Sequence, residues 1–366
     1  MKQYFLGMAA NYARKECLRH TFTIGRERDR GALQRFLTQK YGGEAVLTKN
    51  GRSALALALR AYFEPGDKVI VNGFTCYAVY EAIRETKLVP IWADINKEDL
   101  NFDIKTLEKV INENAKGIII QNSLGNPVDA AAIEKFAKKH NLTIIEDLAH
   151  CVGVKYTDGR EAGTVGAAVA LSFGKDKSID TISGGAVILR RSYKNTIKAP
   201  DKLPKISDTL RARFYPLFGL IARGLSHAHL GGAFMRCLVK IHWVEKSADN
   251  KLDLNRKIAK FEAKLALRQL KNLKKSGKQP LREFCLVKNR TELLKKLAAA
   301  GYYFGGFWYE RPVSPERYYK KVHFPEDACP IAVEVAEKII NLPTYYSRKD
   351  LVPAQKIIAE YLEKEK

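Results

Sequence analysis

Short apolar runs alternate with amphipathic segments from about residue 30 to residue 190. The apolar runs are rich in Ile, Val and Ala and are short, as buried strands are, whereas the segments between them have apolar residues at helical spacing. We predict strands over 68–72, 89–93, 117–121, 142–146, 167–173 and 186–189, and helices over 53–62, 78–85, 103–111 and 130–140.

Strands and helices that alternate in this way are typical of a parallel sheet covered by helices on both faces. The predicted fold class is therefore α/β, with a mostly parallel central sheet. Ligands of such sheets bind at the carboxyl ends of the strands, so the residues directly after each strand are the first candidates for chemistry.

The second half of the chain has a different character. Residues 191–250 are basic and partly apolar, and we predict a helical insertion or connection there. A long helical pattern begins at about residue 251, and a last helix is predicted over 352–364. We therefore divide the chain into a large α/β domain (1–190), the basic segment (191–250) and a small α+β domain (251–366).

The composition is that of a folded protein with a large positive charge. Of its 366 residues 46% are hydrophobic, and the formal net charge is +23. Such a charge favours acidic partners, such as phosphorylated cofactors, nucleotide-linked substrates, anionic lipids or nucleic acids, without choosing among them. The six cysteines form no CxxC pair, and the sequence has neither a signal-peptide pattern nor a membrane-spanning run. We expect reduced thiols and a cytoplasmic location.

The segment Asn50-Gly51-Arg52-Ser53 leads directly into a predicted helix. The free backbone N–H groups of a helix start bind anions, and a glycine beside a hydroxyl residue suits such a site. A serine in this place is more often an ordinary N-cap. This feature alone is a weak indication of a phosphate site.

Polar residues follow two successive predicted strands. Asp147 and His150 come after the first, where an aspartate often only accepts hydrogen bonds from backbone amides. Ser172 and Lys177 come after the second, where a lysine is by default solvated. The order and spacing of the whole set are more informative than any one of its members.

That order and spacing resemble the DegT/DnrJ/EryC1 family of sugar aminotransferases, which are fold-type-I enzymes that use pyridoxal 5'-phosphate (PLP). The likeness covers roughly residues 30–350. The motifs that carry it are Gly51 to Leu55, Gly125-Asn126-Pro127-Val128-Asp129, Glu146-Asp147 with His150, Ser172-Phe173 with Lys177 and Gly184-Gly185, Asn255 with Gln269-Leu270, and Cys329-Pro330 with Leu342-Pro343.

The resemblance implies a smaller C-terminal α+β domain and PLP as the cofactor. Lys177 would hold the cofactor and move the α-proton, Asp147 would bind the pyridine nitrogen, and His150 would lie near the ring. The remaining cofactor-binding residues implied by the family are Gly51, Arg52, Ser53 and Ser172 at the phosphate, with Asn255 reaching the phosphate in the neighbouring subunit of a homodimer.

The reaction implied by the family moves an amino group from glutamate or glutamine to a nucleotide-linked keto sugar, for amino-sugar and surface polysaccharide biosynthesis. One alternative is another PLP reaction, such as sugar dehydration, but dehydratases of this group have His in place of Lys177. A second alternative is a non-catalytic, regulatory relative. The sequence has no nucleic-acid-binding motif, no Walker motif and no GxSxG motif.

Two departures from the family pattern stand out. The family has an aromatic residue stacked on the cofactor ring where this chain has Cys76, so either the thiol lies there or Tyr77 substitutes. The basic segment is longer than the family's usual connection. We interpret residues 205–246 as a helical hairpin over the active site or the dimer interface, and the alternative is an element that contacts an anionic membrane surface.

His227 and His229 lie in the same segment, but no further ligands at recognisable spacing accompany them. We therefore predict no metal site.

Overall fold

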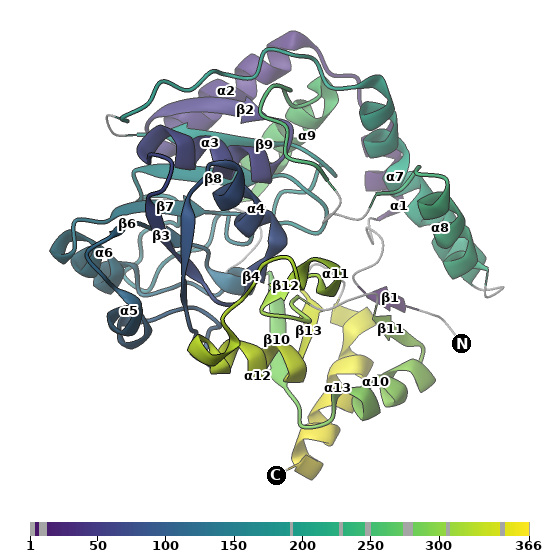
Figure 1. Cartoon of the computed structure of the whole chain (residues 1–366). Helices are drawn as coiled ribbons and strands as arrows, with labels where there is room; N and C mark the ends of the chain where they lie inside the picture. Colours follow the sequence, from purple (N-terminus) through teal and green to yellow (C-terminus); the bar gives the residue numbers. More distant parts are fainter. Residues whose placement is uncertain are drawn as a thin grey trace.

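A seven-stranded sheet forms the centre of the larger part of the molecule (Figure 1). The computed structural model describes residues 4–6, 13–190, 193–226, 230–245, 250–273, 281–304, 308–344 and 348–365. In spatial order the strands are β2 (Glu44–Thr48), β9 (Gly185–Leu189), β8 (Ala168–Ser172), β7 (Thr143–Asp147), β6 (Ala115–Ile120), β3 (Lys68–Asn72) and β5 (Val89–Ala93). All neighbouring strands are parallel except β9, which is antiparallel to both β2 and β8. The predicted α/β class is confirmed.

Helices cover both faces of this sheet, as continuous apolar strands require. In β3 the side chains of Val69 and Val71 belong to one hydrophobic cluster, with α3 (Gly51–Tyr62) and α4 (Tyr77–Glu85). Ile70, between them, belongs to the cluster on the opposite face. The helices there are α2 (Glu27–Tyr41), α5 (Ile104–Val110), α6 (Ala130–Lys139) and α9 (Lys260–Asn272).

The smaller part lies below the sheet in Figure 1 and is built around β10 (Arg282–Leu286) and β13 (Ile339–Pro343), which pair antiparallel. A short parallel pair joins β1 (Tyr4–Leu6) to β11 (Tyr302–Phe304), and another joins β12 (Val313–Ser314) to β4 (Thr75–Cys76). The smaller part also contains α10 (Arg290–Ala299), α11 (Glu316–Tyr319), η4 (Glu326–Ala328), α12 (Pro330–Lys338) and α13 (Arg348–Glu365), whereas η1 (Ser123–Gly125) follows β6 in the larger part.

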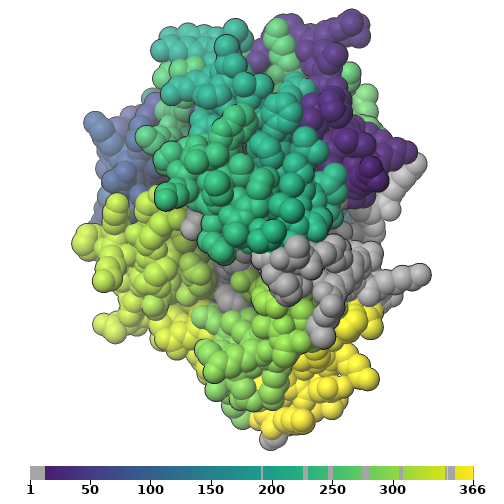
Figure 2. Space-filling model, turned by 90° about the vertical axis from the view of Figure 1, so that its right-hand side faces the viewer, coloured from purple at the N-terminus to yellow at the C-terminus, as the bar shows by residue number. Residues whose placement is uncertain are grey.

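The basic segment forms a helical hairpin of α7 (Ile206–Ser226) and α8 (Gly231–Lys240). Its apolar side chains pack with Phe261 and Leu265 of α9 in one cluster. The hairpin lies beside α1 (Arg14–Phe22), and it forms much of the face shown in Figure 2. The predicted hairpin agrees with these helices, whereas His227 and His229 lie outside the described residues.

The helical pattern predicted from residue 251 was wrong in its first part. Helix α9 begins only at Lys260, because the preceding chain is used for contacts with the start of α3. Helix α9 packs on α2, and β1 pairs with β11, so residues from each predicted outer domain contact the other part of the molecule. The division at residues 190 and 250 stays a prediction.

The described residues contain neither a membrane-spanning helix nor a metal-binding cluster. None of the described helices is long and apolar enough to cross a membrane. Within the same residues, no group of three or more His, Cys, Asp and Glu side chains is arranged to hold a metal ion.

Candidate active site

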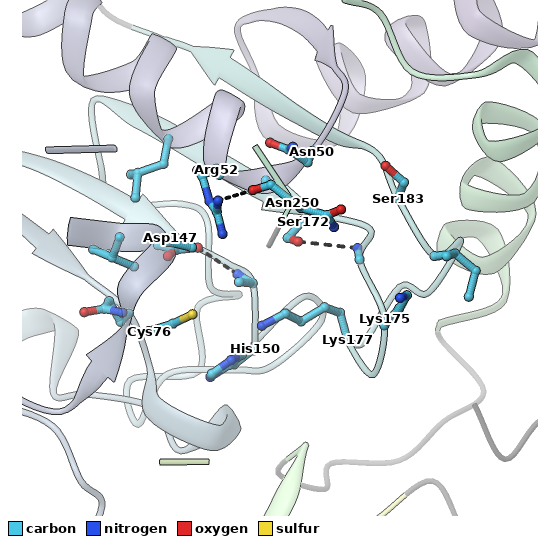
Figure 3. A pocket seen from close by; sticks show the side chains of 18 of the residues that line it. Asn50, Arg52, Cys76, Asp147, His150, Ser172, Lys175, Lys177, Ser183 and Asn250 are labelled. Atoms are coloured by element: carbon cyan, nitrogen blue, oxygen red, sulfur yellow. Dashed lines mark hydrogen bonds between the residues drawn. The ribbon is translucent and has the colours of Figure 1, made fainter. Parts of the chain in front are cut away.

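The carboxyl ends of β6, β7 and β8 open into one pocket of about 860 Å³, measured to its open mouth. The start of α3 and the loop after β8 form further walls (Figure 3), and residues 76, 78 and 79 and Tyr309 of the smaller part also line the pocket. Its lining includes six of the eight predicted site residues, namely Gly51, Arg52, Asp147, His150, Ser172 and Lys177. The sequence-based selection of the strand ends therefore located one continuous pocket.

The start of α3 forms a close-fitting wall of this pocket. Asn50 is the N-cap, and its Oδ1 accepts hydrogen bonds from the backbone N–H and the hydroxyl of Ser53, both at 2.9 Å. A Cβ atom on Gly51 would lie 2.4 Å from the Cβ of Ser172, so only glycine fits there. The close approach brings the Ser172 hydroxyl beside the first free amides of the helix, where an anion is favoured.

Arg52 lines the same wall, but protein groups already engage its guanidinium. It forms an ion pair with Glu81, and it donates to the backbone carbonyl of Asn250. Arg52 is buried, and the ion pair neutralises its charge. We infer that Arg52 fixes the shape of this wall, and that the helix amides and Ser172 are the better anion donors.

Asp147 and Lys177 face the pocket from neighbouring segments. Asp147 ends β7 and accepts a hydrogen bond from the backbone N–H of Ala149 at 3.0 Å. Burial raises the pKa of Asp147, while that hydrogen bond and the charge of Lys177 oppose the rise. Burial of its amine lowers the pKa of Lys177, against the opposing effects of Cys76 and Asp147. The lowered pKa increases the neutral, nucleophilic fraction of the amine.

The loop that carries Lys177 is held at both ends. The backbone N–H of Asp180 donates to Gln269 Oε1 at 2.8 Å, and Gln269 Nε2 donates back to the Asp180 carbonyl at 2.7 Å. The backbone N–H of Thr181 donates to the Phe173 carbonyl and closes the loop on β8. Gln269, which was noted only as part of a motif, therefore positions the lysine loop.

His150 is neutral and held in a layer of aromatic rings. Its Nδ1 accepts from the backbone N–H of Leu124 at 3.2 Å, and its Nε2 lies 3.4 Å from the Tyr309 hydroxyl. Burial lowers the pKa of His150 well below its usual value, and the charges of Lys177 and Arg282 lower it further. Its ring stacks on Trp308, with centroids 5.0 Å apart.

Two predicted site residues lie outside the pocket of this chain. The Ser53 hydroxyl is buried, and its oxygen accepts a hydrogen bond from the backbone N–H of Asp253 at 3.1 Å, so it ties residue 253 to α3. Asn255 is exposed and pairs through its backbone carbonyl with the N–H of Lys202. Its contact with the cofactor of a neighbouring subunit therefore stays a prediction.

Of the two residues considered for the contact with the cofactor ring, Cys76 and Tyr77, only Cys76 lines the pocket. Cys76 lines the pocket, and Lys177 extends toward it and His150 in Figure 3. Tyr77 stacks on Tyr318 with centroids 4.4 Å apart and does not line the pocket. Cys76 is therefore the one of the two that can contact a ligand.

The sequence analysis missed three groups that line the pocket. Gln121 directly follows β6, so the strand-end rule could have found it. Its Nε2 donates to Thr75 Oγ1 at 2.6 Å, and its buried Oε1 has no partner among the described residues. Tyr309 and Asn250 come from distant parts of the chain, and no local pattern marks them.

The hairpin of α7 and α8 contacts the lysine loop directly. Lys175 donates to the carbonyl of Glu245 and lies 4.1 Å from the centre of the Tyr215 ring in α7. This contact favours the interpretation of the hairpin as a cover over one side of the site.

The family model for the "DegT/DnrJ/EryC1/StrS aminotransferase family" matches residues 12–198. Among curated proteins, the chain is 35% identical over 141 residues to the pleiotropic regulatory protein of Geobacillus stearothermophilus, a match that covers 38% of each protein. It is 36% identical over 155 residues to the GDP-perosamine synthase of Escherichia coli O157:H7, covering 42% of each. The chain thus matches about two fifths of the length of these relatives.

Solved structures show the same fold over nearly the whole chain. The PLP form of the putative sugar aminotransferase Spr1654 from Streptococcus pneumoniae has a TM-score of 0.67 at 18% identity, and the match covers 97% of this chain and 98% of that one. The predicted fold-type-I architecture is therefore confirmed.

Proposed function

Because the chain belongs to the DegT/DnrJ/EryC1/StrS aminotransferase family, we propose that it is a PLP-dependent aminotransferase. The observation that carries this proposal is the single pocket in which Lys177, Asp147 and the glycine-cradled start of α3 come together. Each of these groups meets a different chemical need of the same cofactor.

The pocket fits PLP by the chemistry of its walls. Asp147 would bind the ring nitrogen at one end, and the α3 amides with Ser172 would bind the phosphate at the other. The absence of a side chain at Gly51 leaves room for that contact. Among the described residues, Gln121 Oε1 is a buried acceptor without a hydrogen-bond partner, which suits a site that holds a polar ligand.

The residues around Lys177 prepare it for proton transfer. Bound PLP supplies an electron sink for the carbanion formed when an amino acid loses its α-proton. Lys177 accepts that proton at Nζ and returns it, and its lowered pKa favours the neutral amine that acts as the base. The backbone N–H of Ala149 holds the Asp147 carboxyl group at the end of β7, and Gln269 holds the lysine loop in place.

We propose that the acceptor is a nucleotide-linked keto sugar and that the donor is glutamate or glutamine. The family membership and the similarity to a GDP-perosamine synthase support the acceptor class. The net charge of +23 is compatible with a diphosphate-bearing substrate. The product would be an amino sugar for surface polysaccharide assembly.

We further propose a homodimer with shared active sites, in which Asn255 serves the neighbouring subunit. The exposed position of Asn255 leaves it accessible to a partner. A cytoplasmic location stays a prediction. Membrane contact through residues 205–246 is the less favoured alternative, and sedimentation with anionic liposomes, with and without that segment, tests it.

A regulatory role without catalysis is the second candidate, since one relative carries the name of a regulatory protein. Borohydride reduction of the purified protein, followed by peptide mapping, separates the two. We expect a yellow protein whose pyridoxyl label lies on Lys177, and a colourless, unlabelled Lys177→Ala variant. A wild-type protein that takes up no added PLP would favour the regulatory role.

A further inference from the structure

Trp308, in the segment between β11 and β12, places an indole ring directly beside the reacting lysine. Lys177 Nζ is 4.5 Å from the centre of this ring, which is the distance of a cation–π contact. Lys177 lines the pocket that fits the cofactor, whereas Trp308 does not. The indole therefore lies next to the amine but outside the space that the cofactor would fill.

The neighbours of Trp308 hold its indole in place. The His150 ring stacks on it with centroids 5.0 Å apart, and Arg282 Cζ lies 4.0 Å from its centre. Asn341 Nδ2 donates to the backbone carbonyl of Trp308 at 2.7 Å. The side chain is nevertheless only partly buried. A fixed and partly accessible aromatic ring of this kind is suited to contact with a ligand.

Loading with PLP changes what covers this ring. In the cofactor-free structure the Lys177 amine lies over the indole, whose electron-rich face attracts a cation. Under the proposed function, the Lys177 nitrogen is bonded to the cofactor and is no longer a free ammonium ion. Part of the indole face, next to the reacting centre, is then available to another group.

The chemistry of the indole distinguishes between the two proposed substrates. An aromatic face is apolar and carries partial negative charge, so it repels a carboxylate and attracts C–H groups. Glutamate and glutamine carry a carboxylate on the carbon atom that reacts. A hexose ring instead presents a face of C–H bonds whose area is comparable to that of the indole. A keto sugar whose carbonyl carbon reaches the position of Lys177 Nζ can therefore lay this face on Trp308.

We propose that Trp308 recognises the hexose ring of the acceptor by stacking on its C–H face. This inference rests on the proposed aminotransferase function and adds a residue that selects the acceptor. Trp308 binds and orients the sugar, and proton transfer remains with Lys177.

The test measures the two half-reactions of the PLP-loaded protein separately, in single turnovers followed by the absorbance of the cofactor. The donor half-reaction uses L-glutamate or L-glutamine. The acceptor half-reaction starts from the pyridoxamine form and uses a panel of keto hexoses linked to GDP, UDP or dTDP. For Trp308→Leu we expect the half-saturating concentration of the acceptor to rise about 30-fold, and that of the donor to change less than about 2-fold, since loss of a tryptophan contact commonly has such an effect on its own ligand.

Two further variants make the comparison decisive. Trp308→Phe keeps a smaller aromatic face, so we expect a loss of about 5-fold that again concerns only the acceptor. If Trp308→Leu does not fold, this variant carries the test. Trp243→Leu is the matched control, because this tryptophan is 40% exposed and contacts Phe218 of the hairpin with centroids 5.8 Å apart. Both of its half-reactions should equal those of wild type. Acceptor binding should also change the tryptophan fluorescence of wild type and Trp243→Leu, but not that of Trp308→Phe.

Equal losses for donor and acceptor in both Trp308 variants would show that the indole only supports the site, and would overturn the inference. Unchanged saturation by the acceptor in Trp308→Leu would overturn it as well. If borohydride labels Lys177 and the donor reacts, but none of the keto sugars does, the inference fails and the aminotransferase stands. If Lys177 takes no label, both fail.

Discussion

Substitution of Gly51 tests the close contact between the start of α3 and Ser172. In Gly51→Ala the new Cβ would lie 2.4 Å from Ser172 Cβ and 2.7 Å from its Oγ, whereas ordinary contacts begin at 3.4 Å. One of the two segments must therefore shift by about 1 Å. Overpacking of this kind costs about 1–3 kcal/mol, and a 1 Å displacement of a reacting group lowers rates about 100-fold.

Two assays measure these effects separately. Urea unfolding of the cofactor-free protein gives the change in the free energy of unfolding, and absorbance titration gives the affinity for PLP. Gly224→Ala is the control, because a Cβ on this exposed residue of α7 meets nothing within 4 Å. In an exposed helix, alanine stabilises by up to about 1 kcal/mol relative to glycine. A Gly51→Ala protein with wild-type unfolding free energy, PLP affinity and turnover would refute the reasoning.

Three other predictions concern the site, the assembly and the core. Asp147→Asn should lower turnover by at least about 100-fold in a steady-state assay, while the pyridoxyl label stays on Lys177; unchanged turnover would contradict the role of the carboxylate. Mixing inactive Lys177→Ala and Asn255→Ala subunits should restore about a quarter of wild-type activity, because half of the dimers then contain one intact shared site; no gain on mixing would argue against shared sites. Burial raises the pKa of Glu262 from 4.5 in the unfolded chain to about 7 in the folded protein. Protonation of Glu262 therefore stabilises the folded state fully below pH 4.5, and this stabilisation is lost as the pH rises through 7. The free energy of unfolding should fall by about 2 kcal/mol between pH 5.5 and pH 8.5 in wild type and less in Glu262→Gln, as urea titrations at these two pH values would show.

Most strands of the large sheet could be predicted because each is recognisable from its own short run of residues. The runs at 68–72 and 89–93 coincide with β3 and β5, since both are short, apolar and bounded by turns or helices. The direction of β9 could not be predicted in the same way. A short run such as Ala186 to Leu189 is equally suitable for a parallel or an antiparallel strand, and only its pairing with β2 and β8 decides.

The site divides along similar lines. The sequence could place Asp147 and Lys177 at the pocket because each follows a strand of the same sheet and belongs to a spaced motif. Tyr309 and Asn250 were missed because they come from distant parts of the chain, and only the folded structure brings them to the pocket. Neither residue follows a strand of the large sheet, and its place in the pocket cannot be known before the chain is folded.

The pairing of β2 with β9 has a consequence for the order in which the protein forms. In the seven-stranded sheet, β2 lies at the edge and has β9 as its only neighbour, although more than half of the large part separates them in sequence. A ribosome must therefore complete residue 189 before β2 can join the sheet, and contacts over such distances form slowly. Gly51, at the start of α3, closely follows β2. We therefore expect the cofactor pocket to be among the last features to form in the nascent chain.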